Sequence, residues 1–274
     1  MNEQPVNQRG KLSPAAITSI ILVVLCGISL YILIALPYDQ VFRDGWVAFK
    51  GVDPYWHMRM VDNLLHHFPH HMSFDPYYYF PNGMDVPSAF FFDWLIAAIA
   101  RILSLGSPSQ HTVDFVGAYI PAILGTLTII PVYFIGKELF NRWVGVLSAA
   151  LVVILPGEFL NRSLLGFTDH HVAEALLTTV TILFFILALK RAREREISFA
   201  HLINRDWAII AKPLIYTLLA GLFLGIYLLT WWGGLLFVFI IFVYLIIQFL
   251  IDLLRGKSTD YLCLIAPFHP SSPP

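Results

Sequence analysis

The chain has 274 residues, of which 58% are hydrophobic and 13% charged, and its mean hydropathy is +0.71. Soluble domains carry about 25% charged residues, so this composition excludes an ordinary soluble domain and predicts an all-α protein that crosses a membrane several times. A formal net charge of −1 argues against nucleic acid as a partner, because nucleic-acid binding usually requires a basic patch.

About six segments are apolar and long enough to serve as membrane spans, which need about 20 apolar residues each. They are Ala15–Leu36, Val113–Gly136, Trp143–Leu160, Val172–Leu189, Pro213–Thr230 and Leu235–Leu254. The run Phe90–Leu105 is apolar but short, and it carries Asp93 and Arg101. We expect it to form a helix that lies in the interface or packs on the spans.

Lysine and arginine cluster between alternate spans, which predicts the orientation of the chain. The clusters contain Arg9, Lys11, Lys137, Arg142, Lys190, Arg191, Arg193, Arg195, Arg205, Lys212, Arg255 and Lys257. With six spans all of them fall on the cytoplasmic side, together with the N-terminal residues 1–14. Residues 37–112 then form one long external loop and residues 161–171 a short one, within a membrane domain of residues 15–260. Residues 261–274 are rich in proline and serine towards their end, and this composition predicts a disordered tail.

Asp53 lies in the long external loop, directly before Pro54. Proline disfavours helical angles in the preceding residue, so we expect Asp53 to end an extended segment close to a span. A carboxylate in such a place suits a hard divalent cation. The alternative is an Asp-Pro turn or a helix N-cap.

Asp169 and His171 form an Asp-x-His pair in the short external loop. Oxygen and imidazole ligands together suit manganese, magnesium or zinc. Thr168 and Asp169 are also good helix N-caps. The capping and metal-binding roles of Asp169 are compatible, because the positive end of the helix dipole favours a carboxylate in its anionic form. Glu174, one turn further on, is a weaker candidate ligand.

Arg162 stands shortly before this pair. A guanidinium there is suited to holding a phosphate or bracing a carboxylate, and the alternative is an arginine that extends from the span to the membrane surface. A dense cluster of histidines lies in the long external loop, at His66, His67, His70 and His71. Pro69 interrupts any helix that would align them, so we expect exposed loop histidines without a ligand role.

Taken together, these stretches resemble the catalytic subunit of oligosaccharyltransferases in its archaeal single-subunit form. The resemblance runs from about the first predicted span to the sixth. The matching residues are Gly51-Val52-Asp53-Pro54-Tyr55, Arg59, Phe68-Pro69-His70, Asp75-Pro76-Tyr77, Tyr79-Phe80-Pro81-Asn82-Gly83, Asn161-Arg162-Ser163, Gly166-Phe167 and Asp169-His170-His171. It implies a GT-C-type glycosyltransferase fold in the cell membrane, with the active site on the external face.

The resemblance also implies the chemistry. Asp53, Asp169 and His171 would hold Mn²⁺ or Mg²⁺, and Arg162 would support the acidic site and the substrate. The donor would be a dolichol-linked oligosaccharide carrying a phosphate or pyrophosphate, and the acceptor an Asn in Asn-x-Ser/Thr of a polypeptide. Asp53 would accept hydrogen bonds from the acceptor amide and make its nitrogen less conjugated.

Two features of that family lie outside this sequence. One is a later external loop that supplies a glutamate, and the other is a soluble domain with a Trp-Trp-Asp motif that binds the acceptor hydroxyl. Trp231-Trp232-Gly233 does not supply the latter, because glycine stands where aspartate is needed. We therefore expect the N-terminal membrane part of such an enzyme, as a truncated chain or split subunit. The alternatives are another membrane glycosyltransferase that uses a polyprenyl-phosphate sugar, and an inactive fragment or non-catalytic subunit.

Overall fold

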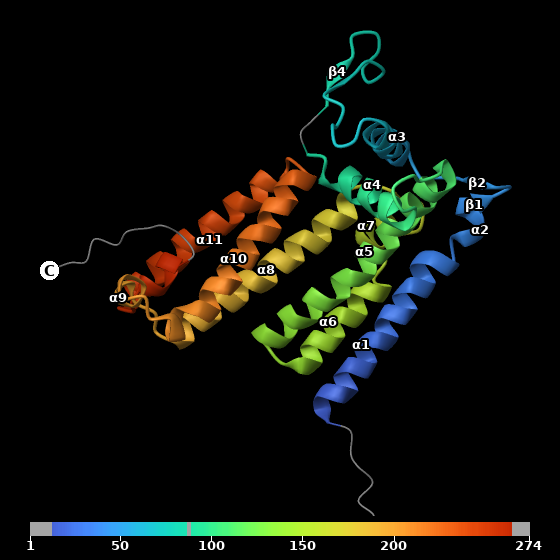
Figure 1. Cartoon of the computed structure of the whole chain (residues 1–274). Coiled ribbons are helices and arrows are strands. Elements are labelled where there is room, and N and C mark those ends of the chain that lie inside the picture. The colour runs from blue at the N-terminus through green and yellow to red at the C-terminus, as the bar shows by residue number, and fades with distance from the viewer. Residues whose placement is uncertain (1–12, 87–88, 265–274) are drawn as a thin grey trace, which may run out of the picture.

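The computed structural model describes residues 13–86 and 89–264. Its long helices form two groups that meet where α8 packs against both α5 and α10 (Figure 1). The first group is α1 (Pro14–Leu30), α5 (Gln110–Leu139) and α6 (Arg142–Ile154), and the second is α8 (His171–Glu194), α10 (Trp207–Thr230) and α11 (Gly234–Leu254). The shorter helices and hairpins between α2 and α5 gather at one end of these helices, and the short helix that follows α8 lies at the other (Figure 1).

Five helices in the described part of the chain are long and apolar enough to cross a membrane. They match five of the six predicted spans. The first runs from Pro14 to Val41 and combines α1, a π-helical turn η1 (Tyr31–Ala35) and α2 (Tyr38–Val41). The others are α5, α8, α10 and α11.

The third predicted span, Trp143–Leu160, is interrupted and does not form one continuous helix. Helix α6 has 13 residues, or about 20 Å, which is shorter than the roughly 30 Å membrane core. Leu155 leaves the helix with a ψ of 117°, as residues before proline commonly do, and Pro156 follows. After Gly157 the chain forms α7 (Glu158–Arg162). Together α6, the break and α7 return the chain to the end where α3 and α4 lie (Figure 1).

Helices α5 and α6 approach each other through glycine. A Cβ atom on Gly145 would lie 2.5 Å from the carbonyl oxygen of Tyr133, a distance that no side chain can adopt. The contact continues through Ile129, Ala149 and Val153, which are all buried. Small residues favour close helix packing in membranes, where apolar area alone gives no advantage.

The segment between α2 and α5 is mostly helical, with two short hairpins. It contains β1 (Phe42–Arg43), β2 (Trp46–Val47), α3 (Asp53–His66), β3 (Phe74–Asp75), β4 (Met84–Asp85) and α4 (Phe91–Leu103). Helix α4 packs against α3 and α5, which agrees with the expectation of a helix packed on the spans. Phe92 and Ile96 of α4 are fully buried with Val61 of α3 in the largest apolar cluster.

The expected extended segment before Pro54 is not formed. Val52 has helical angles, with φ −90° and ψ −44°, and Asp53 is the first residue of α3. Proline is tolerated here because the first helical turn leaves its N–H groups unpaired anyway. A helix begins here instead, but its N-cap position is held by Val52 and not by Asp53.

The C-terminal end of the described chain folds back on the second helix group. After α11, the short helix η2 (Asp260–Leu264) packs against α8 and α9 (Phe199–Ile203). Tyr261 is buried and donates a hydrogen bond of 2.5 Å to Asp252. The first residues of the predicted tail, 261–264, thus belong to η2. Residues 265–274, and the N-terminal residues 1–12 with Arg9 and Lys11, lie outside the described part.

Candidate metal and phosphate site

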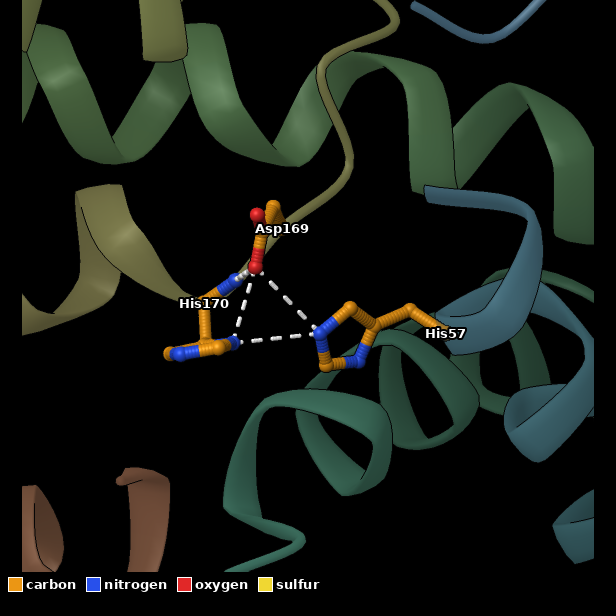
Figure 2. A group of neighbouring side chains, drawn as sticks. All are labelled: His57, Asp169 and His170. Atoms are coloured by element: carbon orange, nitrogen blue, oxygen red, sulfur yellow. Dashed lines mark hydrogen bonds and ion pairs between the residues drawn. The ribbon is translucent and has the colours of Figure 1, made fainter. Parts of the chain in front are cut away.

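The carboxylate of Asp169 lies at the centre of a group of basic side chains and is 1% exposed. Its Oδ1 accepts a hydrogen bond of 2.7 Å from the backbone N–H of His170, and the Nδ1 of His170 lies 2.8 Å away. The Nε2 of His57 lies 3.4 Å from the same oxygen, so the three side chains form a triangle (Figure 2). In contrast, Oδ2 has no hydrogen-bond partner among the described residues. It lies 3.4 Å from Nε2 of His171 and 3.6 Å from Nη1 of Arg162.

A second buried carboxylate, Asp93, lies behind His57. The Nδ1 of His57 donates a hydrogen bond of 2.6 Å to Oδ1 of Asp93. The Nε2 of His71 lies 3.3 Å from the other oxygen of Asp93. His57 comes from α3 and Asp93 from α4, so the packing of these two helices brings the pair together and removes it from water.

The loop before Asp169 is held in place by main-chain hydrogen bonds from three parts of the chain. Gly166 accepts from the N–H of Lys50 and donates to the carbonyl of Ala118, both at 2.9 Å. Leu165 donates to the carbonyl of Leu33 at 2.9 Å. The bond from Lys50 joins the segment just before Asp53 to the segment just before Asp169.

The charges in this group stabilise one another. Burial alone would lower the pKa of His57, but the carboxylates of Asp93 and Asp169 more than offset it and raise that pKa to about 9. Burial would likewise raise the pKa of Asp169, but hydrogen bonds from His170 and His57 outweigh it and hold that pKa far below its usual range. Burial has the same tendency at Asp93, where His57 and His71 outweigh it and lower the pKa. Both carboxyl groups are therefore anionic at neutral pH.

Two sets of side chains in the described residues bring three cation ligands within 4.8 Å of one another. One is His57, Asp169 and His170, and the other is His170, His171 and Glu174. In the second set the Nδ1 of His171 lies 2.9 Å from a Glu174 oxygen. Mixed imidazole and carboxylate donors suit manganese and zinc, and the carboxylates suit magnesium. The buried Oδ2 of Asp169, which has no partner within the described chain, is an oxygen that a cation would satisfy.

Known proteins are similar to this sequence over most of its length. The family described as oligosaccharyl transferase STT3, N-terminal, matches residues 19–266. The chain belongs to the STT3 family. It is 34% identical over 229 residues to the dolichyl-monophosphooligosaccharide–protein glycotransferase AglB of Haloferax volcanii, covering 83% of this chain and 22% of that protein. Dolichyl-phosphooligosaccharide–protein glycotransferase 3 of Archaeoglobus fulgidus is 34% identical over 247 residues, covering 90% and 27%.

Solved structures of related oligosaccharyltransferases have the same fold. An archaeal oligosaccharyltransferase AglB from Archaeoglobus fulgidus, in complex with an inhibitory peptide and a dolichol-phosphate, aligns with a TM-score of 0.80 and 32% identity, covering 92% of this chain and 28% of that one. A complex of the Archaeoglobus fulgidus oligosaccharyltransferase with Zn and sulfate aligns with a TM-score of 0.76 and 33% identity, covering 89% and 29%. The chain thus spans about a quarter of the length of these relatives.

This STT3-family chain brings only some of the predicted site residues into contact. Asp169, His171 and Arg162 lie together, and Arg162 also donates a hydrogen bond of 2.8 Å from Nε to Glu158. Asp53 is exposed and belongs to neither set of three ligands among the described residues. It lines a pocket of about 390 Å³ whose wall also includes His57 and His170. Its role as a ligand therefore stays a prediction.

Three residues of the site, His57, His170 and Asp93, were not selected as functional from the sequence. Asp93 stands out only as an acid in an apolar run, and its burial in α4 explains that position. His57 stands four residues after Asp53, which places it one helical turn away once α3 is formed. That spacing is the signal that could have found it, but only after α3 is recognised as a helix from Asp53 onwards.

The histidine cluster divides into two parts. His66, His67 and His70 are exposed, as expected, and α3 ends at His66 before Pro69. His71 differs from the expectation, because its ring lies against Asp93 and is only 9% exposed.

Proposed function

We propose that this chain supplies the membrane part of an oligosaccharyltransferase that transfers a glycan from a dolichol-linked phosphate or pyrophosphate donor to Asn in Asn-x-Ser/Thr. The strongest support is the buried carboxylate of Asp169. Its Oδ1 is surrounded by donors, while its Oδ2 has no partner in the described chain and lies beside His171 and Arg162. The names of the relatives, which are dolichyl-phosphooligosaccharide–protein glycotransferases, support the substrate class.

In this proposal Asp169 and His171 hold a divalent cation, with Asp53 contributing from the pocket wall. Such a cation, when bound, acts as a Lewis acid that offsets negative charge on the phosphate leaving group. The donor set fits Mn²⁺ or Mg²⁺, since carboxylate oxygens outnumber the imidazole. Asp53 is exposed to the pocket, so it can also accept hydrogen bonds from the acceptor amide.

Arg162 is placed to contact the donor phosphate. Its side chain is 33% exposed, and its guanidinium lies between Glu158 and Asp169. Arginine presents several donors in a plane that matches phosphate oxygens. We infer that Arg162 holds the phosphate beside the cation and keeps it aligned with the pocket.

The distribution of charge supports an external site. In Figure 1, α3, α4 and α7 lie at one end of the long helices, while the α5–α6 turn and the α8–α9 connection lie at the other. That other end carries most of the lysine and arginine residues of the described chain, including Lys137, Lys190 and Arg193. Positive charge marks the cytoplasmic side of membrane proteins. We therefore assign Asp53 and Asp169 to the external face.

The first test is Mn²⁺ binding by the purified chain in detergent, measured by electron paramagnetic resonance. We expect binding that Asp169→Ala abolishes. The control is Asp62→Ala, because Asp62 accepts hydrogen bonds from Gln110 and belongs to neither set of close ligands in the described chain. This control should leave Mn²⁺ binding intact.

The second test measures transfer itself. It uses a chimera in which this chain replaces the matching segment of the Archaeoglobus fulgidus relative. Asp53→Ala or Asp169→Ala in the chimera should abolish metal-dependent transfer of a lipid-linked glycan to an Asn-x-Thr peptide. Unchanged transfer in both variants would refute the assignment.

A further inference from the structure

His57 and Asp93 form a buried pair directly behind Asp169, and neither is among the proposed cation ligands. Given the proposed function, on which this inference rests, we propose that they are positioning residues. Asp93 holds His57, and His57 holds Oδ1 of Asp169, so that Oδ2 is the oxygen presented to the cation. The chain of contacts is Asp93 Oδ1 to His57 Nδ1 at 2.6 Å, then His57 Nε2 to Asp169 Oδ1 at 3.4 Å.

The first link, between Asp93 and His57, is rigid. Asp93 is 2% and His57 5% exposed, and both oxygens of Asp93 are engaged, one by His57 and the other by His71. The helices that carry the pair are packed through the largest apolar cluster, which includes Met58 of α3 and Phe92 of α4. The ring of Phe92 also contacts the His57 ring edge-to-face at 5.2 Å. The imidazole therefore has little freedom to turn.

The second link makes the two oxygens of Asp169 unequal. His57 Nε2 and two nitrogens of His170 surround Oδ1, so this oxygen has three neighbouring nitrogens within 3.4 Å (Figure 2). Within the described residues nothing donates to Oδ2. A carboxylate held through one oxygen cannot rotate without losing those contacts. The other oxygen is thereby kept towards His171, the second proposed ligand.

Hydrogen-bonded partners of metal ligands commonly have this arrangement, and their loss costs about 10–100-fold in metal affinity. The nearest alternative is that His57 itself binds the cation together with Asp169 and His170, since their ligand atoms also lie close together. The two arrangements differ in how many histidine nitrogens are bonded to the ion.

The experiment measures the Mn²⁺ affinity of the full chain in detergent for His57→Ala, His57→Gln and Asp93→Asn. We expect His57→Ala to weaken binding about 10–100-fold. His57→Gln should recover part of the loss, because its amide N–H can donate to Asp169. Asp93→Asn keeps an acceptor for His57 and should weaken binding less than His57→Ala. The matched control is His67→Ala, an exposed histidine just after the end of α3, which should bind Mn²⁺ as the unmodified chain does.

Two outcomes would overturn the positioning role alone. The first is a His57→Ala chain that binds Mn²⁺ with unchanged affinity while Asp169→Ala abolishes binding, because His57 would then be only structural. The second is the loss of one bound histidine nitrogen from the electron spin echo spectrum of Mn²⁺ in His57→Gln, because His57 would then be a ligand. An unmodified chain that binds no Mn²⁺ would instead refute the proposed metal site, and the positioning role with it.

Discussion

The two ends of α3 carry histidines in opposite environments. Near its start, His57 is 5% exposed and lies between two carboxylates. At its end, His66 and His67 are exposed, and each ring nitrogen Nδ1 donates to a main-chain carbonyl of the last turn, at 2.8 and 3.0 Å. The two neighbouring histidines at the end of α3 thus form no ion pair with a carboxylate in the described chain, whereas the single histidine near its start contacts two. Burial beside an anion, rather than the number of histidines, distinguishes the end of α3 that contributes to the proposed site.

The largest expected effect is a loss of folding stability when Asp93, the acid behind His57, is removed. Asp93→Ala would leave a buried, positively charged imidazole without its closest partner. Breaking a buried ion pair in this way costs about 3–5 kcal/mol. Thermal unfolding in detergent, without added metal, measures the change. His67→Ala is the control at the other end of α3, and equal destabilisation by both variants would contradict the comparison.

A smaller loss of stability is expected from a substitution in the loop that carries Asp169. Gly166 has a φ of +79°, and a Cβ there would lie 3.0 Å from a methyl group of Val41. Gly166→Ala should therefore cost about 1–3 kcal/mol, from the backbone conformation and the crowding together. It should also weaken Mn²⁺ binding, because the loop would move. Gly256→Ala is the control, with a φ of +63° and nothing within 4 Å of its Cβ; it should destabilise less and leave Mn²⁺ affinity unchanged.

Asp53 offers the opposite combination, with little effect on stability and a clear effect on binding. It is exposed to the pocket, so Asp53→Asn should change stability by no more than about 0.5 kcal/mol. If it is a ligand, Mn²⁺ affinity should fall by about tenfold or more, since the charge of the ligands sets the affinity of such sites. Titration of the variant with Mn²⁺ measures this, and unchanged affinity would remove Asp53 from the ligand set.

The sequence predicted the helical class, five of the spans and the nearness of Asp169 to His171. These features were accessible because they depend on local composition and short spacing. The break after α6 was missed, since Leu155 and Pro156 end a helix inside an apolar run that hydropathy treats as continuous. The contact of His57 with Asp93 was also missed, because 36 residues separate them and only the packing of α3 on α4 brings them together.

The smallest expected effect on stability and on Mn²⁺ binding comes from substituting the exposed histidines at the far end of α3. His66 and His67 donate to carbonyls of the last turn through exposed hydrogen bonds, and exposed substitutions of this kind usually change stability by no more than about 0.5 kcal/mol each. A His66→Ala, His67→Ala and His70→Ala triple variant should bind Mn²⁺ like the unmodified chain, because none of the three belongs to a set of close ligands among the described residues. A loss of Mn²⁺ binding in this variant, with folding intact, would show that histidine density and not burial locates the cation. The same measurement on His57→Ala then gives the contrast directly, since that variant removes one histidine where the triple variant removes three.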